Sequence, residues 1–253
     1  MSRVIAGFYG KLPARGDFVR GALPRDFTDR WDAWLAPAIA GSRAAMGEDW
    51  LPAFLEAPVW RFAFSAGLCG SRAAIGLMLP SVDRAGRYFP LTFAALYSDG
   101  DAPGDDPVWL DGCEAAGRAA LEQDAGPEQL GAMLGVPEAA SGEAGRTETG
   151  MMQSVWWTEG APRVPATRFV LPGLPDASVY ATMLGGGMPE VALPGVTVPG
   201  VTEPGVTEPG VTKHGLTTPG AVLPGAPEEM MPEAPAETAP AAPTGGESWE
   251  SPS

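Results

Sequence analysis

The stretch PSVDRAGRYFPLT, residues 80–92, connects two apolar runs that are both typical of β-strands. These runs are AAIGLMLPS (73–81) and YFPLTFAALY (88–97), and a third run, VWRFAFSAG (59–67), precedes them after another short connection. Parallel neighbours need a crossover of a dozen or more residues, so connections this short predict an antiparallel meander. Since the runs do not alternate cleanly between apolar and polar residues, we expect both faces of the sheet to be covered.

The residues before this meander predict one more strand and a long helix. VIAGFYG (4–10) is a short apolar run that leads into the loop KLPARGDFVRGALP. A helix is predicted to begin at Pro24, where the missing N–H of proline costs nothing. Pro37 is expected to kink or end this helix. Apolar side chains at helical spacing form one stripe along it: Phe27, Trp31, Trp34, Leu35, Ala38 and Ile39.

The residues after the meander add helices on both sides of two further strands. We predict helices over 106–124 and 127–134, in addition to a short helical piece over 49–56. SVWWT (154–158) and TRFVL (167–171) are predicted strands, residues 137–150 are a predicted loop, and a closing helix starts near Asp176 and ends at 185–187. Helices before and after a central sheet predict an α/β fold, a three-layer α/β/α sandwich with a largely antiparallel sheet.

The domain organisation follows from a change in composition near residue 191. From Pro194 the chain repeats five-residue units such as PGVTE, in which Pro-Gly favours a type II turn. One bulky apolar side chain in five cannot build a packed face that offsets the entropy of ordering. We therefore predict a globular domain over residues 1–190 and a disordered Pro/Gly-rich tail over residues 191–253.

Charge and cysteine content exclude several classes of protein. The net charge is −15, with +2 over residues 1–100 and −17 over the remainder. Such an acidic chain is repelled by the phosphate backbone, so nucleic acid is not expected as a partner. No apolar stretch is long enough to span a membrane, so membrane insertion is not expected and we predict a cytoplasmic protein. Cys69 and Cys113 are expected to be buried thiols.

The charged residues that could form a site lie in two loops. The first, GKLPARGDFVR (10–20), carries Lys11, Arg15, Asp17 and Arg20, and the second, SVDRAGRYFP (81–90), carries Asp83, Arg84 and Arg87. Both loops follow short strands, so we expect them to meet at one end of the sheet. Two interpretations stay open. Asp–Arg pairs could brace the loop ends around turns at Gly16 and Gly86, or the loops could form a binding surface with Trp34 or Phe27 as an exposed anchor.

An enzyme is the less favoured interpretation. The single histidine, His214, lies in the repeat, which leaves no Ser-His-Asp or Cys-His set and no zinc site in the predicted domain. The motifs GxSxG, GxGxxG and GxxxxGK[ST] are absent. We predict no catalytic residue, no cofactor and no metal. The alternative is a metal-dependent phosphoryl-transfer site that uses Asp17 and Asp83.

Three segments together resemble a known family, the type VI secretion-associated protein TagF, also called ImpM. They are GFYGKLPARGDFVRGALPRDFTDRWDAWL (7–35), APVWRFAFSAG (57–67) and GLMLPSVDRAGRYFPLT (76–92). The motif positions that carry the resemblance are Gly10, Lys11, Pro13, Gly16, Asp17, Phe18, Trp31, Asp32, Trp34, Pro80, Ser81, Asp83, Gly86, Arg87, Phe89 and Pro90.

The resemblance implies a small cytoplasmic α/β protein without known catalytic activity, encoded with the secretion machinery. It implies a post-translational repressor of type VI assembly that binds an FHA-domain scaffold protein of the apparatus. Some members of the family carry a PP2C-type phosphatase domain, and here any such link would be in trans. A structural assembly factor is the alternative.

The family does not assign contact residues, so the surface is our hypothesis. We predict that the partner-binding residues are Lys11, Arg15, Asp17, Phe18, Trp34, Asp83, Arg84 and Arg87. We predict a structural role for Gly10, Pro13, Gly16, Trp31, Asp32, Pro80, Ser81, Gly86, Phe89 and Pro90.

Overall fold

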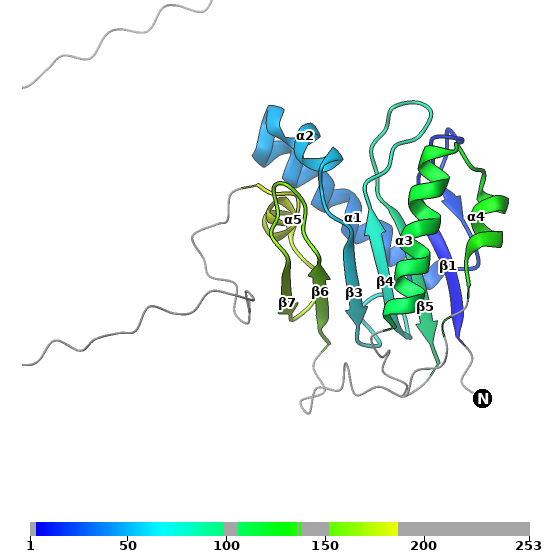
Figure 1. Ribbon diagram of the computed structural model, residues 1–253. Coiled ribbons are helices and arrows are strands. Elements are labelled where there is room, and N and C mark those ends of the chain that lie inside the picture. Colours follow the sequence, from blue (N-terminus) through cyan, green and yellow to red (C-terminus); the bar gives the residue numbers. More distant parts are fainter. Residues whose placement is uncertain (1–3, 99–105, 136, 138–151, 187–253) are drawn as a thin grey trace, which may run out of the picture. The chain divides into compact units, whose positions relative to one another are not determined.

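A seven-stranded sheet forms the centre of the protein (Figure 1). This computed structural model describes residues 4–98, 106–135, 137 and 152–186, so the predicted tail and most of the predicted loop over 137–150 lie outside the described residues. The strand order is β2-β1-β5-β4-β3-β6-β7, and every pair of neighbours is antiparallel. The strands are β1 (Ile5–Gly10), β2 (Val19–Arg20), β3 (Trp60–Phe64), β4 (Ala73–Leu79), β5 (Leu91–Tyr97), β6 (Ser154–Thr158) and β7 (Thr167–Leu171).

Helices cover the sheet on both faces (Figure 1), which confirms the three-layer α/β/α sandwich. One face is covered by α1 (Arg25–Met46), α2 (Trp50–Leu55) and α5 (Ala177–Met183), with a 3₁₀ turn at Gly47–Asp49 between α1 and α2. The other face is covered by α3 (Pro107–Glu122) and α4 (Pro127–Met133). None of the described helices combines the length and the apolarity that crossing a bilayer requires.

Each face of the sheet has its own hydrophobic core. The core under α1 is aromatic, and the fully buried Trp31 lies at its centre, within 6.5 Å of the rings of Phe62, Phe64 and Trp156. The core under α3 is mainly aliphatic and contains Leu110 of α3. Cys69 and Cys113 are buried free thiols, one in each core, as predicted.

Of the two effects expected of Pro37, a kink or an end of the helix, the second does not occur, because α1 continues past it. Pro37 lies inside the helix and is exposed, and the helix continues to Met46. A proline removes only one backbone hydrogen bond, here the one to the carbonyl of Ala33, which is also on the exposed side. Burial of Leu35 and Ala38 on either side of the proline holds the helix against the sheet.

The closing helix α5 begins where the sequence predicted. Asp176 is its N-cap, and its Oδ1 accepts hydrogen bonds from the backbone N–H groups of Ser178 and Val179, both at 2.9 Å. The helix packs against α1 and contributes to the same aromatic core. Its carbonyl at Met183 also accepts the indole N–H of Trp60 at 2.9 Å.

Candidate functional site

The two predicted loops meet at one end of the sheet, as expected. We call residues 11–18 and 80–90 together the two-loop site. Strand β1 ends next to the start of β5, since Tyr9 pairs with Thr92, so the loop after β1 lies beside the loop before β5. Several hydrogen bonds join the loops, among them Ser81 Oγ to the Lys11 carbonyl at 2.7 Å and Arg84 N–H to the Arg15 carbonyl at 2.9 Å.

A buried ion pair lies at the base of the two-loop site. Lys11 Nζ donates to Asp83 Oδ2, and the two side chains are only 6% and 0% exposed. The same oxygen accepts from Arg87 Nε at 2.7 Å, while Asp83 Oδ1 accepts from the backbone N–H groups of Ala85 and Arg87 at 2.9 Å. Burial alone would raise the pKa of the Asp83 carboxyl, but these hydrogen bonds, with that of Lys11 the largest, hold it well below its usual range.

Arg87 connects the two loops and still reaches solvent. Its Nη2 donates to the Gly16 carbonyl and lies 4.0 Å from Oδ1 of the fully exposed Asp17, and its own side chain is 59% exposed. The turn before it needs glycine, because Gly86 has a φ of +78°. Gly16, in contrast, is not among the glycines with positive φ, so the expectation that both glycines supply their turns holds for Gly86 alone.

Three aromatic rings form the side wall of the first loop. Phe18 stacks on Tyr9, with ring centroids 5.3 Å apart, and meets Phe89 edge to face at 4.8 Å. Lys11 Nζ lies 4.5 Å from the centroid of the Phe18 ring. Even with these contacts Phe18 remains 44% exposed, so it presents an apolar ring at the edge of a charged site.

Tyr9 of β1 borders the two-loop site, and the sequence reasoning missed it. Its hydroxyl donates to Asp32 Oδ1 at 3.2 Å, which links the loop wall to α1. Burial, followed by the neighbouring Asp32 carboxylate, raises the pKa of Tyr9 above its ordinary value. The signal was available in GFYG (7–10), where strand alternation sends Phe8 and Tyr9 to opposite faces of the sheet.

The structure corrects the predicted surface at three positions. Lys11 and Asp83 are buried and pair with each other, so they support the surface rather than form it. Trp34 lies away from the loops, between α1 and α5, where its indole N–H donates to the Pro175 carbonyl at 2.6 Å and its ring meets Tyr180 edge to face. The alternative anchor, Phe27, is also buried. The exposed candidates are Arg15, Asp17, Phe18, Arg84 and Arg87.

The residues assigned a structural role lie around these loops and in the core. Among the three glycines of this group, Gly10 has the least room for a side chain, because a Cβ there would lie 2.2 Å from the Pro90 carbonyl oxygen. Buried positions are Gly10, Trp31, Ser81, Phe89 and Pro90, half-buried ones are Pro13, Gly16, Asp32 and Pro80, and Gly86 is exposed at the turn.

The alternative phosphoryl-transfer site finds little support in the geometry. Both oxygens of Asp83 are already bound by Lys11, Arg87 and two backbone N–H groups, and Asp17 points into solvent. A Mg²⁺ ion would need free carboxylate oxygens at this point. Within the described part of the chain no group of three or more His, Cys, Asp or Glu side chains could hold a metal ion.

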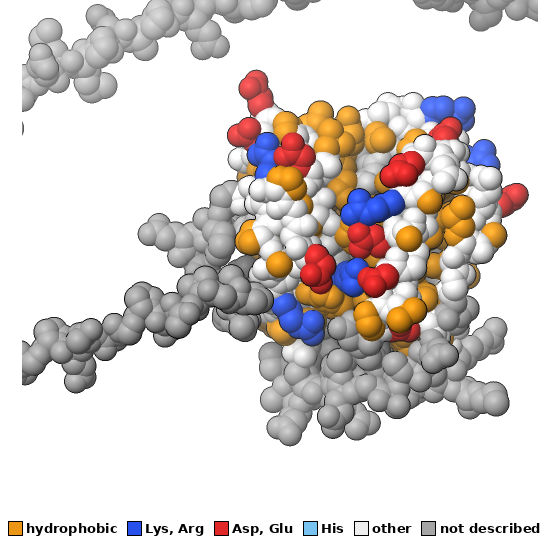
Figure 2. All heavy atoms as spheres, viewed as in Figure 1, with side chains coloured by type: hydrophobic (Ala, Val, Ile, Leu, Met, Phe, Trp, Pro, Cys, Tyr) orange, Lys and Arg blue, Asp and Glu red, His pale blue; other side chains and the backbone are white. Residues whose placement is uncertain are grey.

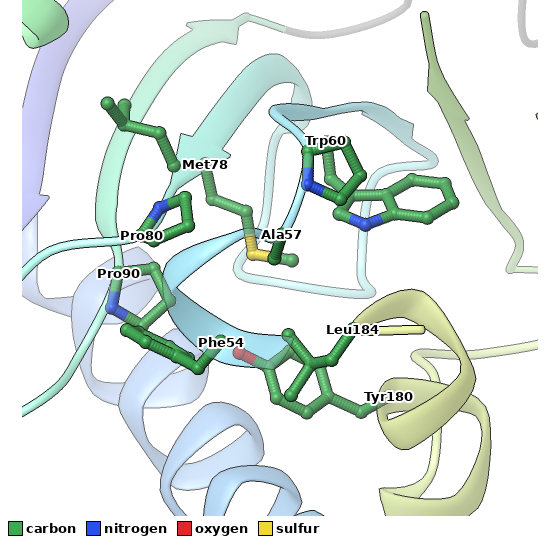
Figure 3. A pocket seen from close by; sticks show the side chains of 10 residues that line it. Phe54, Ala57, Trp60, Met78, Pro80, Pro90, Tyr180 and Leu184 are labelled. Atoms are coloured by element: carbon green, nitrogen blue, oxygen red, sulfur yellow. The ribbon is translucent and has the colours of Figure 1, made fainter. Parts of the chain in front are cut away.

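An apolar pocket lies beside the second loop. Figure 3 shows Pro80 and Pro90 on one side of the pocket and Tyr180 and Leu184 on the other. The space within it, open solvent included, is about 220 Å³, whereas sites for small ligands usually enclose about 300 to 1,000 Å³. The pocket is therefore small for a metabolite, and Phe54 at its edge helps to anchor the loop through Tyr88, at 5.8 Å between ring centroids.

A charged network on the face of the sheet that α3 and α4 cover is a further feature that the sequence reasoning missed. Arg61 of β3 reaches Asp111 at 2.7 Å and Glu114 at 3.2 Å on α3, and Arg118 pairs with Glu114 at 2.9 Å. Figure 2 shows acidic and basic side chains mixed along the middle of the viewed face, over α3 and the strands beside it. Because the charges are paired with one another, the network ties α3 to the sheet.

The fold and the two loops define an α/β/α protein with an antiparallel sheet and a braced site built from GKLPARGDF and PSVDRAGRYFP. A family described as the TagF N-terminal domain, type VI secretion system-associated, matches residues 7–135, about half of the chain. The chain belongs to this family, and both loops lie inside the matched segment.

A solved structure agrees with this assignment. The chain is similar to PA0076 from Pseudomonas aeruginosa PAO1, with 32% sequence identity over 78% of this chain and 100% of that one, and with a TM-score of 0.65. A search of curated proteins gave no match. The resemblance inferred from the two loop motifs is thus confirmed, and the protein is an accessory protein associated with type VI secretion.

Proposed function

We propose that this protein is a non-enzymatic regulator of type VI secretion that acts by binding a protein partner through the two-loop site. In this proposal it is a post-translational repressor, and the partner is the FHA-domain scaffold protein of the secretion apparatus. The family assignment supports a role in secretion. The repressor mechanism, the cytoplasmic location and a link in trans to a PP2C-type phosphatase stay predictions that the family resemblance implies.

One observation carries the proposal: a group of exposed side chains lies above a buried ion pair. The base is the Lys11–Asp83 pair, which Arg87 completes. Above it, arginine and aromatic side chains remain accessible, and these are the residue types enriched at the energetic centres of protein interfaces. The accessible residues are Arg15, Asp17, Phe18, Arg84 and Arg87.

A rigid base favours binding because little conformational entropy is lost when a partner docks. Backbone hydrogen bonds fix the second loop from within, from Asp83 N–H to the Arg87 carbonyl at 3.1 Å and from Gly86 N–H to the Asp83 carbonyl at 2.9 Å. Separate hydrogen bonds to the Asp83 carboxylate, from Lys11, Arg87 and the backbone N–H of Ala85, count against catalysis at Asp83, since they engage both of its oxygens.

Secretion assays test this function directly. Deleting the gene should increase release of the secreted tube protein, and overexpressing the intact chain should reduce it. The Phe18→Ser variant should fold normally and fail to repress, whereas Phe18→Tyr should repress. If deletion abolishes secretion, the protein is a structural assembly factor, and if neither deletion nor overexpression changes secretion, the repressor proposal is wrong.

A further inference from the structure

We propose that the two-loop site recognises an acidic, carboxylate-rich segment of its protein partner. The inference rests on the proposed function, because it names the chemistry of the partner that this same site binds. It depends on three exposed arginines whose backbone positions the two loops bring together, Arg15, Arg84 and Arg87.

The three arginines are grouped by the backbone and not by chance side-chain positions. Arg84 N–H donates to the Arg15 carbonyl at 2.9 Å, so the two residues are held side by side from different loops. Arg87 follows three residues later and is fixed by Asp83 at 2.7 Å. Among the described residues, neither Arg15 nor Arg84 has a carboxylate within ion-pair distance.

The local charge is opposite to that of the whole chain. The exposed charges of the two-loop site are three arginines and one aspartate, Asp17, whereas the chain carries −15. At physiological ionic strength charges are screened over about 8 Å, so a docked segment responds to these side chains more than to distant acidic residues. The nearby Phe18 ring, 44% exposed, offers an apolar contact beside the arginines.

Carboxylates suit this arrangement because guanidinium groups bind them through paired N–H donors. Several other arginines of the described chain already form ion pairs with carboxylates. Arg61 and Arg118 are paired with acidic residues of α3, and Arg163 is paired with Glu56. Arg168 of β7 is exposed like Arg84, but it lies over the ring of Trp157 of β6, and β7 is the edge of the sheet opposite β2. It therefore provides a matched control.

The test is an NMR titration of the full chain with two synthetic peptides, one rich in glutamate and one with glutamine at the same positions. The glutamate peptide should shift backbone amide signals of residues 14–18 and 84–87, and the glutamine peptide should not. The double variant Arg15→Gln, Arg84→Gln should weaken binding by about fivefold or more, because each exposed charge pair contributes modestly. Arg168→Gln should bind as the unchanged chain does.

The inference is overturned if millimolar glutamate peptide causes no shifts in these loops, if both peptides shift them equally, or if Arg168→Gln has the same effect as the double variant. This result is separable from failure of the proposed function. Suppose that deleting the gene increases secretion but that the double variant represses secretion normally. The protein would then be a regulator, and recognition of an acidic segment by Arg15 and Arg84 would be excluded.

Discussion

Lys11 and Asp83 lie 72 positions apart in the sequence and form a buried ion pair that joins the loop after β1 to the loop before β5. A lysine is rarely buried without a partner, because the loss of hydration must be offset by an opposite charge and hydrogen bonds. The pair therefore has a structural role, and the exposed side chains above it are the ones available to a partner.

Removing the cation of this pair should destabilise the protein. Lys11→Met keeps a side chain of similar length but leaves the Asp83 carboxylate with Arg87 as its only charged partner. We expect the melting temperature to fall by about 5 to 10 °C, since breaking a buried pair costs more than losing an exposed charge. Arg84→Met, which alters an exposed cation in the same site, should change it by less than about 2 °C. Equal melting temperatures for the two variants would contradict the structural role.

The depressed pKa of Asp83 predicts a dependence of stability on acid. Because the folded-state pKa lies below the unfolded value of about 3.9, the carboxylate contributes stability above that value and loses it as the pH falls through the folded pKa. Denaturant titrations from about pH 7 to about pH 2 should show much of this loss for the intact chain and a smaller one for Asp83→Asn. Parallel pH profiles for both proteins would show that Asp83 is not stabilised in this way.

The turn of the second loop gives a paired test of backbone geometry. Gly86 has a φ of +78° and open space around its Cα, so Gly86→Ala should cost about 1 to 2 kcal/mol through backbone strain alone. Gly16→Ala, also in open space but without positive φ, should leave the free energy of unfolding unchanged or slightly higher. Chemical denaturation measures both, and a larger loss at Gly16 would mean that the two turns are assigned the wrong way round.

Substitution of Trp34 should destabilise the protein more than substitution of Phe18. Trp34→Phe removes the indole donor to the Pro175 carbonyl and contacts with Tyr180, so it should lower the free energy of unfolding by about 1 to 3 kcal/mol. Phe18→Ser removes a ring that is 44% exposed and should cost less than Trp34→Phe. If Phe18→Ser proves the more destabilising of the two, Phe18 is a core residue and not a surface one.

Much of the fold could be predicted from local sequence. Short connections such as residues 80–90 fix antiparallel neighbours, and apolar periodicity located the helices on both sides of the sheet. The meeting of the two loops was also predictable, since each follows a strand of the same sheet. Whether Pro37 ends its helix could not be predicted, because the sequence shows where a hydrogen bond is lost but not how strongly tertiary packing holds the helix on either side.

The burial of individual site residues could not be predicted. Lysine and aspartate are usually exposed, and only the three-dimensional pairing of Lys11 with Asp83 makes their burial favourable. Trp34 was assigned to the surface because the residue that accepts its indole N–H, Pro175, is 141 positions away in the chain. Helical spacing defines an apolar stripe but does not tell which edge of that stripe another helix will cover.

Calorimetric titration of the FHA-domain scaffold protein into the full chain, and into the Phe18→Ser and Arg84→Glu variants of the chain, measures whether the two-loop site binds the partner. We expect the intact chain to bind and each variant to bind about tenfold more weakly or not at all, while circular dichroism shows that each remains folded. Arg168→Glu should bind as the intact chain does. Undiminished affinity in both loop variants would show that the two-loop site is not the partner-binding surface.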